Sequence, residues 1–125
     1  MKTKELLEVY YHGLAQKNGW ESVLSDDFKF IGGDMTQREP VRGKKAYIEI
    51  LQRFGRLFNT MRVKEMFIRD NDAFVLANYD YVFPGGKAVN GDVAELWKVK
   101  DGKLDELTIY FDTLSFEKLL HSEIK

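Results

Sequence analysis

The stretch from Gly91 to Asp112 constrains the fold most, because two strand-like runs flank a short turn there. Both runs, Val93–Val99 and Leu104–Phe111, are rich in β-branched, aromatic and aliphatic residues, and Asp101-Gly102 lies between them. An Asp-Gly pair in this setting is a strong hairpin signal. Since side chains alternate between faces along a strand, simple pairing about the turn predicts a polar face and an apolar face. The polar face would hold Glu95, Thr108, Tyr110 and Asp112, and the apolar face Leu96, Leu107, Ile109 and Phe111.

Composition narrows the classes of function. The 125 residues are expected to form a single domain, 1–125, and a net charge of -1 predicts no nucleic-acid and no membrane partner. The chain has no cysteine and two histidines, too few for a thiolate or histidine metal cluster, so no metal site is predicted. It also has no apolar run of membrane-spanning length and no signal-peptide pattern. A cytoplasmic location is therefore expected.

Apolar periodicity predicts helices gathered early in the chain and strands gathered late. In the second long helix, Lys44, Lys45, Arg53 and Arg56 would form an exposed face. This order favours an α+β fold, with helices packed on one face of a curved antiparallel sheet. The expected helices are 3–17, a short turn at 20–24, 44–58 and 113–121. The expected strands are 28–31, 61–69, 73–83 and the two strands of the hairpin, with a loop at 32–40.

Several short segments, taken in order, carry a resemblance to a known family. They are Tyr10-Tyr11, the passage from Trp20 to Phe28, Val41–Ala46, Leu96–Leu104 and Tyr110–Asp112. Over nearly its whole length the chain resembles the SnoaL-like branch of the nuclear-transport-factor-2-like superfamily. The resemblance implies a cone-shaped fold, in which a strongly curved sheet wraps around N-terminal helices and encloses a cavity. It also implies a homodimer formed through the outer face of the sheet.

The resemblance implies candidate catalytic residues as well. Polyketide cyclases of this kind place an acid/base aspartate where Asp112 stands, but their partner histidine has no counterpart here. Steroid isomerases place a base near Gly32, with Asp34 two residues on. Their oxyanion donors fall near Tyr11 and Glu95. These enzymes need no cofactor, and none is expected for this chain.

Two carboxylates are the candidate catalytic residues, and each has a structural alternative. Asp112 is either a general base or the cap of the closing helix. Glu95 is either a buried, protonated hydrogen-bond donor to an oxyanion or an exposed strand glutamate paired with a lysine.

Five further residues are candidates for ligand binding. Asn78 and Asp80 would pair near Val93 and Gly91, on the face that holds Asp112, although a register error of one residue reverses that face. The aromatic candidates are Tyr11, Trp97 and Tyr110, for which a plain core role is the alternative.

The sequence leaves two functions open. One is a cofactor-free isomerase, cyclase or lyase that acts on a small apolar carbonyl compound through Asp112. The other is a non-catalytic module that binds a small hydrophobic molecule in the same cavity or serves for dimerisation. A homodimer is expected because one face of the hairpin is too apolar to face water and could pack on a second subunit or on the helices: Ala94, Leu96, Leu107, Ile109 and Phe111.

Overall fold

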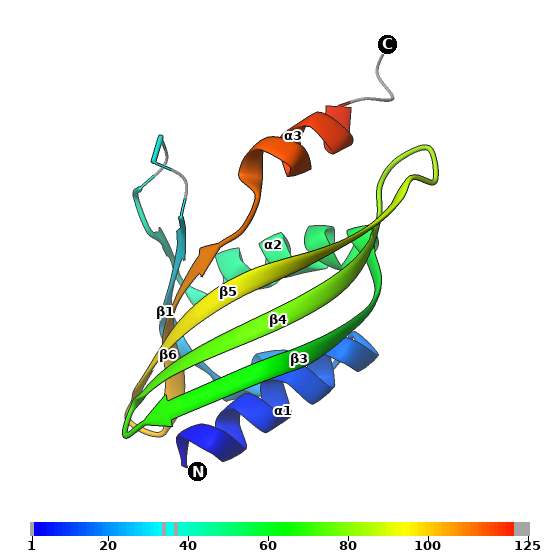
Figure 1. Cartoon of the computed structure of the whole chain (residues 1–125). Coiled ribbons are helices and arrows are strands. Elements are labelled where there is room, and N and C mark those ends of the chain that lie inside the picture. The colour runs from blue at the N-terminus through cyan, green and yellow to red at the C-terminus, as the bar shows by residue number, and fades with distance from the viewer. Residues whose placement is uncertain (1, 34, 37, 122–125) are drawn as a thin grey trace.

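The computed structural model describes residues 2–33, 35–36 and 38–121, which form one twisted sheet with helices packed against it (Figure 1). The helical elements are α1 (Thr3–Gln16), the 3₁₀ turn η1 (Trp20–Val23), α2 (Lys44–Phe54), the 3₁₀ turn η2 (Gly55–Leu57) and α3 (Thr113–His121). The strands are β1 (Leu24–Gly32), β2 (Val41–Arg42), β3 (Phe58–Arg69), β4 (Asp72–Val82), β5 (Ala88–Lys100) and β6 (Lys103–Tyr110). Their order in the sheet is β2-β1-β6-β5-β4-β3, and all neighbours are antiparallel except β1 and β6. The predicted α+β class is confirmed.

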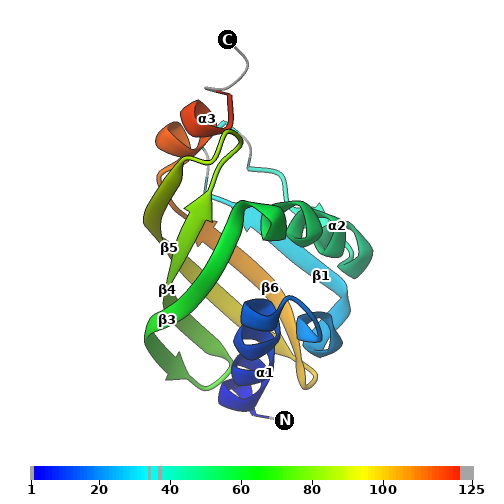
Figure 2. The ribbon, with the colours of Figure 1, turned by 90° about the vertical axis from the view of Figure 1, so that its right-hand side faces the viewer.

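Helix α1 forms because its apolar residues recur every three or four positions, which places them on one face. This face is buried against the sheet, on the same side as α2 (Figure 2). Lys17 ends the helix in the left-handed conformation, with a φ of 64°. Its ammonium group donates to the carbonyl oxygens of Gly55 (2.6 Å) and Phe58 (2.5 Å), which ties the end of α1 to the start of β3.

The inner face of the sheet is the face that packs on the helices. Alternate residues of β4 point inward and are buried there: Ala73, Val75, Ala77, Tyr79 and Tyr81. Beside them Trp97 lies 4.7 Å from Tyr10 between ring centroids, and Phe28 lies 4.6 Å from Tyr47. The Tyr10–Trp97 pair is edge-to-face and the Phe28–Tyr47 pair is tilted, and ring contacts at these separations add attraction to the hydrophobic effect. The core is therefore a packed aromatic cluster between α1, α2 and the sheet.

Bulges bend the sheet around the helices. The register of β3 against β4 shifts twice, between Phe58 and Thr60 and between Val63 and Glu65. A bulge adds a residue to one strand and increases its local bend and twist. Figure 2 shows the resulting curve of β3 around α1 and α2.

The register of the hairpin differs from the predicted one because β6 contains a third bulge. Lys98 pairs with Glu106 but Val99 pairs with Leu104, so Asp105 is an extra residue in β6. Its carboxylate instead accepts from the Ser25 hydroxyl (2.8 Å) and the Lys29 ammonium (3.2 Å).

This shift moves every residue beyond the bulge by one position. Glu95 pairs with Ile109, not Thr108, and Ala94 pairs with Tyr110. The inner face holds Glu95, Leu107 and Ile109. The outer face holds Ala94, Leu96, Thr108 and Tyr110, so the predicted grouping of faces was wrong.

The turn between β4 and β5 is also one residue tighter than predicted. Phe83 and Lys87 close it, with the Phe83 N–H donating to the Lys87 carbonyl at 2.9 Å. Asn78 therefore pairs with Asp92 and Asp80 with Asn90, rather than with Val93 and Gly91. This correction places Asn78 and Asp80 on the outer face.

The remaining differences concern the ends of elements. Strand β1 begins at Leu24 rather than at Phe28, and the two-residue strand β2 lies in a region where the sequence predicted no strand. Helix α2 ends at Phe54, where η2 continues it. No helix among residues 2–33, 35–36 and 38–121 is long and apolar enough to cross a membrane.

Candidate functional site

A cavity of about 880 Å³ opens between the inner face of the sheet, α2 and α3. Its walls are mainly apolar, from residues such as Phe54, Phe83 and Phe116. The polar residues divide by depth: Tyr10, Tyr79 and Glu95 are buried, whereas Arg53, Arg56 and Glu117 are exposed. The cavity therefore has an apolar body, one buried carboxylate at its inner end and charged groups at its rim.

The buried carboxylate is held by a network that we call the Glu95 network: Glu95, Tyr11, Tyr79 and Trp97. The indole N–H of Trp97 donates to the Tyr11 hydroxyl at 2.8 Å, and that hydroxyl donates to Oε1 of Glu95. The Tyr79 hydroxyl donates to Oε2 over a longer 3.4 Å. Oε1 is thus firmly fixed, while Oε2 faces a weaker partner and is the more available oxygen.

Burial changes the ionisation of Glu95. The side chain is only 4% exposed, and desolvation raises its pKa from 4.5 to about 7, although the two tyrosine hydrogen bonds favour the charged form. A carboxyl group with a pKa near neutrality is present in both protonation states at physiological pH. It can therefore accept a proton and return it.

The tyrosines in and behind the cavity do not ionise. Burial raises the pKa of Tyr11 and Tyr79 well above 10, and the nearby Glu95 raises them further. The Tyr10 hydroxyl shares a hydrogen bond of 2.6 Å with the hydroxyl of Tyr47. These phenols stay protonated at all ordinary pH values, and Tyr79, which lines the cavity and makes only a long hydrogen bond, can donate to negative charge that develops on a nearby oxygen.

Three of the seven residues predicted from the sequence meet at this network. Tyr11, Glu95 and Trp97 come from α1 and β5, and hydrogen bonds connect all three. Only Glu95 among them lines the cavity. Glu95 matches the buried alternative raised from the sequence, not the exposed, lysine-paired one.

Asp112 lies elsewhere, at the start of α3. It is exposed, and its Oδ1 accepts the backbone N–H of Ser115 at 3.0 Å. This hydrogen bond, with Lys118 nearby, lowers the pKa of Asp112. The geometry is that of a helix N-cap, which is the structural alternative for this residue, and Asp112 is not part of the cavity lining.

Asn78 and Asp80 form a polar cluster on the outer face of the sheet. Asn78 donates to Asn90 and Asp92, while Asp80 accepts from Thr60, Asn90 and Arg62. These hydrogen bonds, from Thr60 above all, lower the pKa of Asp80. The cluster stabilises the pairing of β3, β4 and β5 and does not line the cavity.

Tyr110 also lies on the outer face, 52% exposed, where its ring covers Gly33. A Cβ at Gly33 would lie 2.2 Å from that ring, so only glycine permits the contact. Asp34, the other residue considered as a base, lies outside the described residues.

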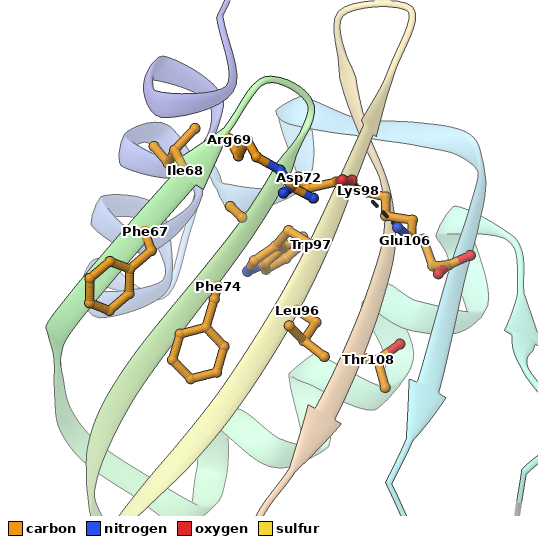
Figure 3. A pocket seen from close by; sticks show the side chains of 11 residues that line it. Phe67, Ile68, Arg69, Asp72, Phe74, Leu96, Trp97, Lys98, Glu106 and Thr108 are labelled. Carbon is orange, nitrogen blue, oxygen red and sulfur yellow. Dashed lines mark hydrogen bonds and ion pairs between the residues drawn. The ribbon is translucent and has the colours of Figure 1, made fainter.

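Another part of the outer face is a shallow groove of about 420 Å³, lined by apolar side chains and by the charged residues Arg69, Asp72, Lys98 and Glu106. Figure 3 looks onto it, with Phe67, Phe74, Leu96 and Thr108 in neighbouring positions across β3 to β6. Phe67 is 61% and Leu96 42% exposed. Large apolar side chains in such a contiguous patch often mark an interaction surface.

The sequence analysis missed Tyr79 and Tyr10 as cavity residues. Tyr79 lies between the polar residues Asn78 and Asp80 on β4. Because side chains alternate between the two faces of a strand, placing Asn78 and Asp80 on the outer face would have placed Tyr79 on the inner face. Arg53 and Arg56 were predicted to form an exposed face, which they do, but that face borders the cavity. Within the part of the chain that the structure describes, no group of three histidine or acidic residues could hold a metal ion.

Comparisons with known proteins agree with the fold. The model of the SnoaL-like domain family matches residues 7–107, so the chain belongs to this family. No curated protein matches the chain.

Three solved structures illustrate the likeness. TerC, co-crystallised with polyporic acid, is 20% identical, with a TM-score of 0.79 and coverage of 95% of this chain and 98% of TerC. A candidate SnoaL-like polyketide cyclase from Jannaschia sp. CCS1 is 16% identical, with a TM-score of 0.79 and coverage of 94% and 90%. A candidate ketosteroid isomerase from Kribbella flavida is 16% identical, with a TM-score of 0.72 and coverage of 88% and 77%. The fold is therefore nuclear-transport-factor-2-like.

The raised pKa of Glu95 makes stability depend on pH. Because the folded-state pKa of about 7 exceeds the ordinary 4.5, the folded protein binds this proton more tightly than the unfolded chain does. The contribution of this proton to the free energy of unfolding is complete below the pKa of the unfolded state and is lost as the pH rises through 7. We expect Glu95→Gln, whose amide oxygen can accept from Tyr11 while its amide N–H donates to the Tyr79 hydroxyl, to gain roughly 2–3 kcal/mol relative to wild type between about pH 5 and about pH 8.5.

Urea unfolding at several pH values measures this difference. Glu65→Gln, at an exposed glutamate of β3, is the matched control and should follow the wild-type pH profile. Parallel profiles for wild type and Glu95→Gln would show that Glu95 titrates normally.

The cap at Asp112 predicts a local effect. Asp112→Ala removes the acceptor for the Ser115 N–H, so the first turn of α3 should open more often. Hydrogen exchange of the α3 amides should become several-fold faster, while Asp112→Asn, which keeps an acceptor oxygen, should change it little. Unchanged exchange in the alanine variant would contradict the capping role.

Proposed function

We propose that this SnoaL-like protein is a cofactor-free isomerase, cyclase or lyase that acts on a small apolar carbonyl compound, with Glu95 as its acid/base. The observation that carries the proposal is the Glu95 carboxyl group at the inner end of an apolar cavity, with a pKa of about 7 and two tyrosine donors. The role that the sequence suggested for Asp112 passes to Glu95, because Asp112 caps α3 outside the cavity.

The proposed chemistry is a proton transfer at a carbon next to a carbonyl group. Ionised Glu95 removes the proton through Oε2, the oxygen with the weaker hydrogen bond, and the electron pair moves onto the carbonyl oxygen. The Tyr79 hydroxyl, held only at 3.4 Å, can turn to donate to that developing oxyanion. Neutral Glu95 then returns the proton, either to a different carbon or to a leaving oxygen. Tyr11 and Trp97 act as positioning residues, since the Tyr11 hydroxyl holds Oε1 and the Trp97 indole N–H holds that hydroxyl.

A binding role without turnover is the second candidate. It is favoured by one observation: Glu95 is the only carboxylate at the inner end of the described cavity, and no imidazole lines it. The similar fold of TerC, which was co-crystallised with polyporic acid, supports ligand binding but does not distinguish the two functions.

Deuterium exchange at the α-carbon of 2-tetralone, an apolar bicyclic ketone, tests the proposal without knowledge of the natural substrate. Wild type should accelerate the exchange, with a rate that rises with pH to a plateau above about pH 7, as the base ionises. Glu95→Gln should lower the enzyme-dependent rate by about 10²-fold or more. Glu65→Gln should leave it unchanged.

The outcomes separate the hypotheses. A Glu95→Gln variant as active as wild type would overturn the role of Glu95, and a loss of activity in Asp112→Asn would restore the role suggested by the sequence. If wild type binds the ketone, as seen by NMR, but exchanges no proton, the binding role is supported instead.

We also propose a homodimer formed through the outer groove. Phe67, Phe74 and Leu96 line this groove, and the side chains of Phe67 and Leu96 are largely exposed there. Sedimentation velocity at concentrations on the order of 10 μM should give a dimer. Leu96→Glu should shift it towards monomer, whereas Leu114→Glu, at a leucine 66% exposed on α3, should not. A monomeric wild type would contradict this assembly.

A further inference from the structure

The rim of the cavity carries two arginines that the proposed proton transfer does not use. Arg53 lies in the last turn of α2 and Arg56, three residues on, lies in η2; both line the cavity next to Phe54 and Leu57. Both side chains are exposed, in contrast to the buried Glu95 and Tyr10 at the inner end. The two guanidinium groups therefore belong to the entrance, not to the core.

Neither arginine has an ionic partner among the described residues. Four other cations of this chain do form ion pairs: Lys29 with Asp105, Arg62 with Asp80, Lys64 with Asp92, and Lys98 with Asp72. These four pairs involve β1 or the outer face of the sheet. Within residues 2–33, 35–36 and 38–121, by contrast, no side chain pairs with the two arginines at the rim, so their guanidinium groups can bind another molecule.

The acidic groups that line the cavity do not neutralise this charge. Glu95 lies at the inner end, where burial favours its neutral form. Glu117 lines the rim from α3, and its Oε2 contacts Nε2 of His121 at 3.1 Å. Arginine stays charged at any ordinary pH, so the rim retains a net positive charge.

We infer that the cavity binds an amphipathic anion, which is an apolar molecule with an acidic group at its outer end. Arg53 and Arg56 would hold that group, preferably a carboxylate, because planar guanidinium groups match carboxylate geometry. The apolar walls would hold the body. This inference rests on the proposed function only for the inner end of the ligand, where the carbonyl group meets Glu95.

The experiment compares two probes with the same apolar body, 2-naphthylacetate and its neutral analogue 2-naphthylacetamide. We expect wild type to bind the anion about tenfold more tightly, as calorimetry or NMR titration would measure. Added salt should weaken binding of the anion and leave the amide unaffected.

The variant Arg53→Gln/Arg56→Gln should lose the preference for the anion and bind the amide as wild type does. Arg42→Gln, at an exposed arginine outside the cavity lining, is the matched control and should keep the preference.

The results are distinguishable from those of the proton-transfer assay. Equal affinity of wild type for the two probes, or an unchanged preference in the double variant, would overturn the inference while leaving the role of Glu95 intact. A clear anion preference that depends on the arginines would support it even if wild type exchanged no proton. If neither probe binds wild type, the ligand class is wrong.

Discussion

The rest of the structure depends on how one carboxyl group is kept inside an apolar fold. Glu95 is buried between α1 and the sheet, and tyrosines from both sides supply its hydrogen bonds, Tyr11 from α1 and Tyr79 from β4. An unpartnered carboxylate in this position would cost several kcal/mol, so the two hydroxyls are what makes the site possible. The same burial that makes the residue costly also raises its pKa towards neutrality, which is the property that a proton-transfer catalyst needs.

The curvature of the sheet gives this carboxyl group access to a ligand. Bulges in β3 bend the strands around the helices, and α2 and α3 border the space left between them. The bulge at Asp105 turns Ile109, rather than Thr108, towards the same interior as Glu95. Backbone irregularities that look minor in the strand pairing therefore decide which side chains face the cavity. The outer face of the same strands is left with the polar cluster and the apolar groove.

The sequence was sufficient to predict most helices and strands, but not which side of the sheet their residues face. Helix α3 was predicted at its observed bounds, and the order of the four long strands was correct, because periodicity and turn residues act locally. Which side chains face inward depends on the strand register, and no local sequence pattern indicates the two features that set it. These features are the extra residue at Asp105 and the shorter turn closed by Phe83 and Lys87. Each moved the register by one position, which reversed the assignment of Asn78, Asp80 and Tyr110. Glu95 was identified as a candidate from its aromatic surroundings and from the family resemblance, whereas Tyr79 required the correct register. The cytoplasmic location stays a prediction.

The most direct test of the central claim is the pKa of Glu95 itself. Carbon-13 labelling of glutamate side chains, with assignment by Glu95→Gln, allows the carboxyl resonance to be followed by NMR as a function of pH. We expect a midpoint at about pH 7, because burial raises the pKa of Glu95 despite the hydrogen bonds from Tyr11 and Tyr79. A midpoint close to the ordinary 4.5 would mean that water solvates the group, and it would contradict both the enclosed site and its proposed chemistry.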